Sequence, residues 1–92
     1  MDAQKIAGLL DELEAQLHSR GESNWIRGVI AAKQALKTLG GLEEARSIYA
    51  TMNQGVEGFA DYNIWHDDFD TRRALNAEID RLRMELWNEF AL

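Results

Sequence analysis

Apolar residues recur at intervals of three and four in four stretches of this chain, and glycines separate the first three of those stretches. The interval matches the 3.6-residue turn of an α-helix, so each stretch is predicted to be a helix with a buried face. The sequence thus predicts an all-α fold: a compact four-helix domain with a non-helical aromatic connection between helices three and four. The expected helices cover residues 2–20, 23–39, 42–53 and 70–90.

The whole chain, residues 1–92, is expected to be a single helical domain. No internal repeat, low-complexity tract or proline-rich linker divides it, and its length suits one small core. Its apolar runs are too short to cross a bilayer, and acids follow its first residues where a secretory signal needs an unbroken apolar run. We therefore expect no membrane contact and a cytoplasmic location.

The apolar patterns of the first two predicted helices differ, and the difference predicts their places in the bundle. Residues 2–20 carry one narrow stripe, which predicts an edge helix with one buried face. Residues 23–39 carry a broad apolar face that includes Leu39, and a second face with Ile26 and Ile30, which predicts a central helix. Ser23 is its predicted N-cap, since a serine hydroxyl can accept from a free backbone N–H of the first turn.

The net charge of −6 argues against a nucleic-acid partner, because affinity for a phosphate backbone comes largely from lysine and arginine. The stretch 23–39 is unusual in holding Arg27, Lys33 and Lys37 and no acid. We expect the acidic helices around it to neutralise this stretch within the fold, and an external anion site is the alternative.

Residues 55–68, called the connection below, abandon helical spacing and gather aromatic residues, a histidine and acids. Large apolar side chains there would be costly to leave in water, so we expect a lid packed across the open end of the bundle, with a binding loop as the alternative. Residues 61–65 show some alternation in polarity, as an extended segment would. The candidate partner-binding residues of the connection are Phe59, Asp61, Tyr62, Trp65, His66, Asp67 and Asp68.

The cluster His66, Asp67, Asp68 and Asp70 offers the nitrogen and oxygen ligands that metal sites use. Its spacing is unspecific, and the glycine and glutamate of a calcium-binding loop are missing. Acids at the start of a helix are explained by capping and by the helix dipole. We therefore expect neither a bound metal nor a cofactor, and a metal-dependent enzyme is kept as an alternative.

No residue pattern of the chain predicts nucleophilic catalysis. The chain has no cysteine, its serines lack the strand-turn-helix elbow that exposes a catalytic hydroxyl, and it has no glycine-rich phosphate loop. We therefore expect no catalytic residues and no enzyme activity.

A second apolar patch on the last predicted helix projects away from the main buried stripe of that helix. Large apolar groups outside the main face either widen the buried contact or meet a second chain, and a small domain gains stability from dimerisation. The pattern alone leaves both readings open. The candidate dimer face consists of Ala77, Met84, Trp87 and Ala91.

Residues 58–64, Gly-Phe-Ala-Asp-Tyr-Asn-Ile, followed by a helix with Leu75, Ile79 and Leu82, resemble part of a group of small uncharacterised bacterial helical domains. Those domains carry a Gly-(Phe/Ser)-x-Asp-(apolar) element between a third and a fourth helix. They often have a polar residue where this chain has Ala60. The resemblance implies a bacterial accessory or immunity-type protein without catalytic residues.

These features together predict a non-enzymatic bacterial protein-binding module, and in its sharpest form an immunity or antitoxin-like protein. An acidic surface would steer association with a basic protein such as a nuclease toxin. Tyr62 and Trp65 would be the desolvated side chains at the centre of that contact. The alternatives are a small metal-dependent enzyme built on the His66 cluster and a structural homodimer.

Overall fold

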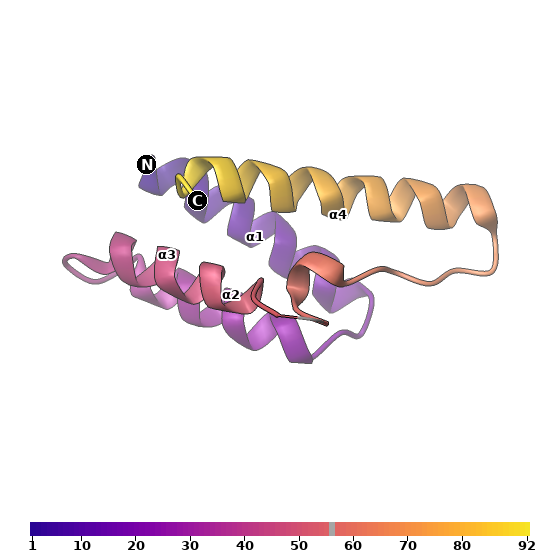
Figure 1. Cartoon of the computed structure of the whole chain (residues 1–92), viewed down its shortest axis with the longest axis horizontal. Coiled ribbons are helices and arrows are strands. Elements are labelled where there is room, and N and C mark those ends of the chain that lie inside the picture. Colours follow the sequence, from indigo (N-terminus) through magenta and orange to yellow (C-terminus); the bar gives the residue numbers. More distant parts are fainter. Residues whose placement is uncertain (56) are drawn as a thin grey trace.

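The chain folds into four α-helices in this computed structural model, which describes residues 1–55 and 57–92. Val56, within the connection, lies outside the described residues. No strand occurs in the described part of the chain, so the predicted all-α, four-helix fold is confirmed. The helices are α1 (Ala3–Ser19), α2 (Asn24–Ala35), α3 (Gly41–Met52) and α4 (Phe69–Glu89), and a short 3-10 turn, η1 (Phe59–Asp61), lies within the connection (Figure 1).

The start of α2 is capped by Glu22, and the prediction of a Ser23 cap is wrong. The Glu22 carboxylate accepts from the backbone N–H groups of Asn24 at 2.9 Å and Trp25 at 2.7 Å. The backbone of Ser23 is already in the right-handed helical region, and its hydroxyl makes no capping hydrogen bond. The longer Glu22 side chain reaches the free amides in its place, and its negative charge suits the positive end of the helix dipole.

Helix α2 ends at Ala35, four residues earlier than the apolar pattern predicts. The Thr38 hydroxyl donates to the Ala35 carbonyl at 2.8 Å, and the chain turns tightly before α3. A Cβ on Gly41 would lie 1.6 Å from the Ala35 carbonyl oxygen, so only glycine fits there. Leu39 lies in this turn and is fully exposed, so its predicted place in the buried face is wrong.

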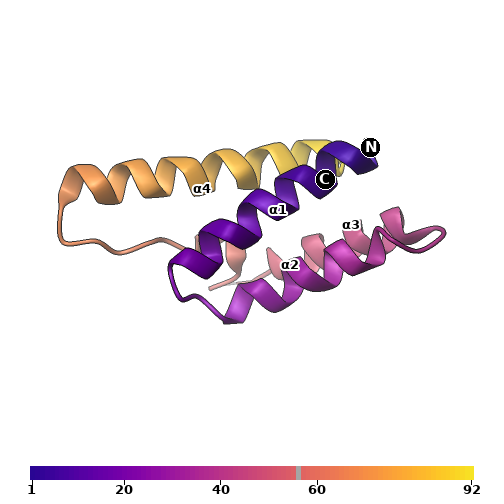
Figure 2. The ribbon, with the colours of Figure 1, turned by 180° about the vertical axis from the view of Figure 1, so that it is seen from behind.

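Helix α1 lies in the middle of the fold, where the sequence predicted an edge helix. It packs against both α2 and α4, and α2 packs in turn against α3 (Figures 1 and 2). The single apolar stripe of α1 is buried along its whole length, and α1 packs against both α2 and α4. Ile30, assigned to a second apolar face of α2, is exposed instead. The buried residues of α1 are Ile6, Leu9, Leu10, Leu13 and Leu17.

The buried side of α3 carries a tyrosine that ties it to α4. Tyr49 is 1% exposed, and its ring stacks on Phe90 with 5.4 Å between ring centres. Its hydroxyl donates to the Arg83 carbonyl of α4 at 3.3 Å. Burial raises the pKa of the Tyr49 phenol to about 12, because the phenolate would lose its hydration there.

The raised pKa of Tyr49 predicts a loss of stability in strong alkali. The folded pKa of about 12 exceeds the ordinary value of 10.0, so the stabilisation is fully present below pH 10 and is lost as the pH rises through 12. The loss should be on the order of 2 kcal/mol. Urea unfolding of wild type and Tyr49→Phe across this pH range measures it, since the phenylalanine variant cannot titrate at this position. Parallel curves for the two proteins would contradict the prediction.

The basic stretch within residues 23–39 is partly neutralised inside the fold, as expected. The Lys33 ammonium lies 2.7 Å from the Asp11 carboxylate and 3.0 Å from that of Glu14, and both acids belong to α1. Hydrogen bonds to these two carboxylates raise the pKa of Lys33. This contact joins α2 to α1 beside their shared apolar core.

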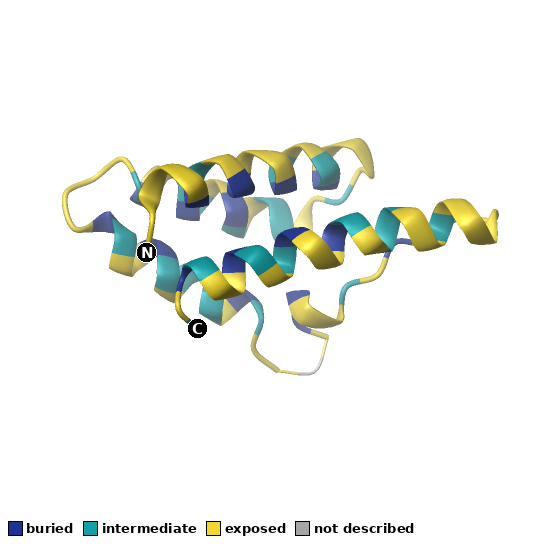
Figure 3. Cartoon of the chain, turned by 90° about the horizontal axis from the view of Figure 1, so that it is seen from above, coloured by how far each residue is buried: buried dark blue, intermediate teal, exposed yellow. Residues whose placement is uncertain are grey.

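The N-terminal half of α4 extends beyond the packed body of the chain, as Figure 3 shows. The structure measures 44 × 26 × 22 Å, and α4 lies along its long direction (Figure 1). The connection runs beside this overhanging half and joins it from η1. None of the described helices combines the length and apolar composition needed to cross a membrane.

Candidate protein-binding surface

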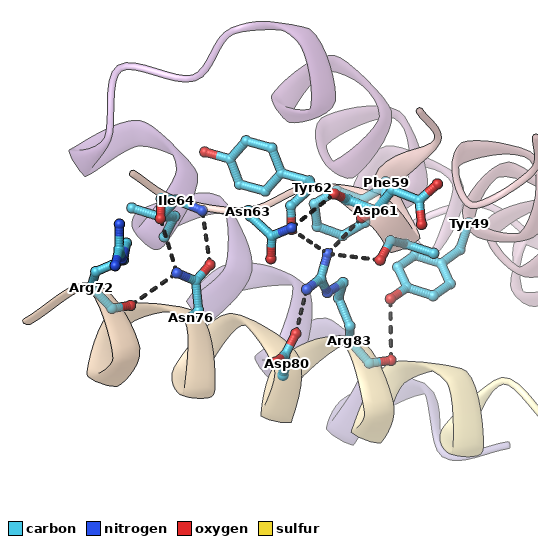
Figure 4. Close-up of polar contacts among 11 residues, drawn as sticks. Tyr49, Phe59, Asp61, Tyr62, Asn63, Ile64, Arg72, Asn76, Asp80 and Arg83 are labelled. Atoms are coloured by element: carbon cyan, nitrogen blue, oxygen red, sulfur yellow. Dashed lines mark hydrogen bonds and ion pairs between the residues drawn. The ribbon is translucent and has the colours of Figure 1, made fainter. Parts of the chain in front are cut away.

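Asn76 holds the connection against the overhanging half of α4. Its side-chain oxygen accepts from the backbone N–H of Ile64 at 2.8 Å, and its side-chain nitrogen donates to the Ile64 carbonyl at 2.9 Å (Figure 4). The same nitrogen donates to the Arg72 carbonyl at 2.9 Å. One amide thus supplies both partners that a neighbouring strand would give to Ile64, and the connection is ordered without a sheet.

Arg83, seven residues after Asn76 on α4, makes a second attachment to the connection. Its guanidinium donates to the carbonyls of Phe59 at 2.6 Å and Tyr62 at 2.8 Å, and it pairs with the Asp80 carboxylate (Figure 4). The side chain is only 12% exposed. Nη1 of the guanidinium donates to the carbonyls while Nη2 pairs with Asp80, and a lysine, which has one nitrogen, could not divide these contacts between two atoms.

Phe59 is the buried residue that closes the open end of the bundle. It is 0% exposed, and its ring centre lies 5.7 Å from that of Trp25 and 6.1 Å from that of Tyr62. The Arg83 guanidinium lies 5.4 Å from the same ring centre. The connection packs as a lid here, as predicted. Because its ring is enclosed, Phe59 cannot contact a partner, and its place among the partner-binding candidates is corrected to a supporting one.

Beyond η1 the connection is extended and alternates in burial, as the sequence pattern predicted. Tyr62 is half-buried and Asn63 is exposed, whereas Ile64 is buried and Trp65 is exposed again. Successive side chains of an extended segment point to opposite sides, so the side that buries Ile64 necessarily leaves Trp65 outside. The lid therefore does not include Trp65, whose ring is 74% exposed.

The exposed Trp65 forms an aromatic cluster with the first turn of α4. Phe69 is 59% exposed, and the Arg72 guanidinium lies 4.4 Å from the Trp65 ring centre and 5.3 Å from that of Phe69. A cation over aromatic faces holds the rings in place while their outer sides stay in water. A groove of about 500 Å³ runs from this cluster along α4 to Asp80.

A second groove of about 450 Å³ continues from Asp80 toward the C-terminal end of α4. Met84 and Trp87 line it on α4, and Asn53 and Ala60 line it on the side of α3 and η1. The two grooves share Asp80 and follow residues of α4 that are spaced four, four, three, four and three apart. We call this stripe the outer face of α4: Phe69, Arg73, Ala77, Asp80, Met84 and Trp87.

The candidate dimer face lies on the surface, and the alternative that it widens the core is wrong. Met84 is 65% exposed and Trp87 is 44% exposed, and Ala77 is exposed between them and the aromatic cluster. Ala91 is also exposed but has left the helix, with a backbone φ of 57°. Its carbonyl accepts from Arg46 of α3 at 3.0 Å, which closes the end of α4.

The His66 cluster caps α4 and does not gather around a common point. The Asp68 carboxylate accepts from the backbone N–H of Thr71 at 2.9 Å and from its hydroxyl at 2.7 Å, and these bonds lower the pKa of Asp68. The imidazole Nδ1 of His66 accepts from the Asp68 backbone N–H at 3.0 Å. Among residues 1–55 and 57–92, no group of three or more histidines and acids is placed to hold a metal ion.

The acids of the connection lie outside both grooves. Asp61 is exposed and accepts from the Glu57 backbone N–H at 3.2 Å, and Asp67 and Asp68 are exposed at the start of α4. The charged side chains that line the grooves are three arginines and one aspartate. The acids expected to share a surface with the aromatic side chains are therefore not among the residues that line the grooves.

Sequence reasoning missed Asn76, Arg83 and Phe69. The signal for Asn76 is its place inside a helix, where asparagine is unfavourable unless its side chain has a partner. Phe69 begins the four-three spacing that continues to Trp87. No sequence signal separates Arg83 from the exposed arginines of α4.

Comparisons of the chain with protein-family models, with curated proteins and with solved structures gave no match. The resemblance to small bacterial helical domains therefore stays a prediction. The function is argued below from the surface that the structure describes.

The Asn76 amide predicts a local effect that hydrogen exchange can measure. Asn76→Ala removes the acceptor of the Ile64 amide, so we expect that amide to exchange about 10-fold faster, as the loss of one net hydrogen bond implies. Asn88→Ala is the matched control, because Asn88 is exposed on the same helix. Equal protection of the Ile64 amide in both variants would show that Asn76 does not hold the connection.

Proposed function

We propose that the chain is a non-enzymatic protein-binding module whose contact surface is the outer face of α4 together with Trp65. One observation carries this proposal. Of the seven large apolar side chains that are exposed among the described residues, four lie on this surface: Trp65, Phe69, Met84 and Trp87. Single exposed apolar residues are ordinary, whereas a row with a pair of them at each end, joined by two grooves across Arg73, Ala77 and Asp80, is typical of a protein contact.

The chemistry of the row suits protein recognition. Tryptophan and arginine are enriched among the residues that dominate binding energy, and the row places tryptophans at both ends and arginines between them. Trp65 is attached through Ile64 to Asn76, so its backbone position is set before a partner arrives. A fixed aromatic side chain loses little conformational entropy on binding, which strengthens the contact.

In a more specific form of this proposal, the partner is a basic protein and the chain has an immunity or antitoxin-like role. The net charge of −6 supports them, because an acidic protein attracts a basic one over long distances. Asp61, Asp67 and Asp68 contribute to that attraction from outside the grooves. Association by this route should slow as salt is added, since screening shortens the range of the field.

Photo-crosslinking in the cells that naturally produce the chain tests the proposal. A photo-reactive residue replaces Trp87 in one variant and Trp65 in another, and Leu39, fully exposed in the turn before α3, is the control position. We expect covalent adducts with protein at Trp87 and Trp65 and none at Leu39. No adduct at the first two positions, or equal labelling at Leu39, would overturn the proposed surface.

A further inference from the structure

We propose that the outer face of α4 binds the same face of a second copy of this chain, with the two α4 helices antiparallel. This inference rests on the proposed contact surface, and it takes a second copy of the chain, and not a basic protein, as the partner of that surface. The overhanging half of each α4 lies against the second groove of the other copy, the one that Met84 and Trp87 line beside Ala60. A contact related by a twofold axis must use one self-complementary patch on both copies.

Each half of the outer face presents large exposed apolar side chains beside a groove. The overhanging half carries Phe69 and the neighbouring Trp65, which project into solvent with 59% and 74% of their surfaces exposed. The other half carries Met84 and Trp87, which are 65% and 44% exposed, beside a groove of about 450 Å³ between α4 and the segment around Ala60. An antiparallel pair fills each groove with the aromatic end of the other copy, and both contacts form at once.

The spacing of charges fixes the register of this pair. A twofold axis that passes between the two helices, level with the Asn76–Ala77 peptide, leaves Arg73 and Asp80 at equal axial distances from it, about 5 Å at a rise of 1.5 Å per residue. Arg73 of each copy is then level with Asp80 of the other. Ala77 lies at the axis, where its small side chain lets the two helices approach closely.

Apolar side chains meet in the same register. Phe69 and Met84 are each about 11 Å from the axis, so Phe69 of one copy is level with Met84 of the other. Opposite charges and apolar groups are thus matched at successive levels, as in antiparallel helix pairs.

The charged pair is free to form across the two copies. In the described part of the chain Arg73 takes part in no ion pair, and it is exposed on α4. The Asp80 side chain stays 61% exposed although it pairs with Arg83, so one of its oxygens can accept from a second arginine.

The available area predicts a dimer that dissociates on dilution. The exposed fractions of Trp65, Phe69, Met84 and Trp87 correspond to about 500 Å² of apolar surface per copy. A standard interface buries about 800 Å² per partner, and the polar side chains around the row supply part of the difference. The interface is therefore at the small end of the range for specific complexes.

Sedimentation velocity of the full chain over a concentration series tests the proposal. Wild type is expected to pass from monomer to dimer as concentration rises, and Met84→Glu to weaken association by at least about 10-fold, because it buries an unpaired charge. Leu39→Glu adds the same charge at an exposed position in the turn before α3 and should leave association unchanged. Circular dichroism melting of each variant confirms that it is folded.

A charge exchange between two variants tests the antiparallel register. Arg73→Asp alone places acids level with Asp80 of the second copy, and Asp80→Arg alone places arginines level with Arg73, so each variant is expected to be monomeric where wild type dimerises. An equimolar mixture pairs acids with arginines at both sites, and its dimers should return.

Two results overturn the second-copy proposal: a wild-type monomer at every concentration, or a mixture as monomeric as its components. If the photo-reactive residue at position 87 then still labels a different protein, the proposed function stands without a second copy. If no adduct forms either, both proposals fail.

Discussion

Replacing Phe59 with alanine is expected to lower the free energy of unfolding by about 3–5 kcal/mol, the largest effect of any substitution considered for this chain. The ring is 0% exposed and lies between Trp25, Tyr62 and the Arg83 guanidinium. Its removal leaves a cavity at the open end of the bundle, and Arg83 loses the surface on which it rests. Urea unfolding followed by circular dichroism measures the change.

Phe69→Ala is the matched control for this prediction. Phe69 is the same residue type ten positions later and is 59% exposed, so its removal should change the free energy of unfolding by no more than about 0.5 kcal/mol. Both measurements are made at low concentration, where the chain is monomeric. Equal losses in the two variants would show that Phe59 is not the residue that closes the bundle.

Arg83→Met is expected to lower the free energy of unfolding by about 2–3 kcal/mol, the second largest effect. Methionine keeps much of the volume of the side chain but leaves the carbonyls of Phe59 and Tyr62 without their shared donor. It also removes the ion pair with Asp80. The connection should loosen, and backbone amides from Phe59 to Ile64 should exchange faster.

Arg73→Met on the same helix separates this effect from a general loss of charge. Arg73 is exposed, so at low concentration its replacement should leave the free energy of unfolding within about 0.5 kcal/mol of wild type. Arg83→Lys is a further comparison, because lysine keeps the charge but has a single nitrogen, so it cannot bond the carbonyls and the Asp80 carboxylate through separate nitrogens. Full stability in the lysine variant would show that charge alone explains the role of Arg83.

The spacing of apolar residues was sufficient to predict the helices and most of the core. Every residue of the predicted stripe of α1, from Ile6 to Leu17, is buried. The same spacing could not show that α1 lies between two neighbours, because it identifies a buried face and not which helix covers that face. The apolar spacing also predicted that the second helix continues to Leu39, because spacing does not reveal the tight turn at the Thr38 hydroxyl and Gly41.

The sequence predicted only part of the candidate surface, because spacing within one helix does not show which other segments contact that helix. The exposed stripe containing Met84 and Trp87 was visible because it projects away from the main apolar face of α4. Asn76 and Arg83 bond to backbone groups of a segment that precedes them in the chain. These contacts form only when the connection folds back along α4, so the spacing of residues in the sequence does not predict them.

The exposure of Trp65 shows that a difference of one position along an extended segment decides whether a side chain is buried or exposed. The sequence predicted that the large apolar residues of the connection form a lid, and Phe59 and Ile64 do so. Trp65 follows Ile64 directly in an extended segment, so it faces the opposite side. Trp65, which the sequence assigned both to the lid and to a partner contact, is thus exposed and lies outside the lid.

Hydroxyl-radical footprinting of the chain inside the cells that produce it, compared with the dilute purified chain, tests most directly whether the outer face of α4 is a contact surface. We predict that Phe69, Met84 and Trp87 are oxidised several-fold less in the cell, while Ile30 and Leu39, exposed on α2 and in the turn that follows it, are oxidised equally in both. Equal oxidation of Met84 and Trp87 in the two conditions would contradict the account.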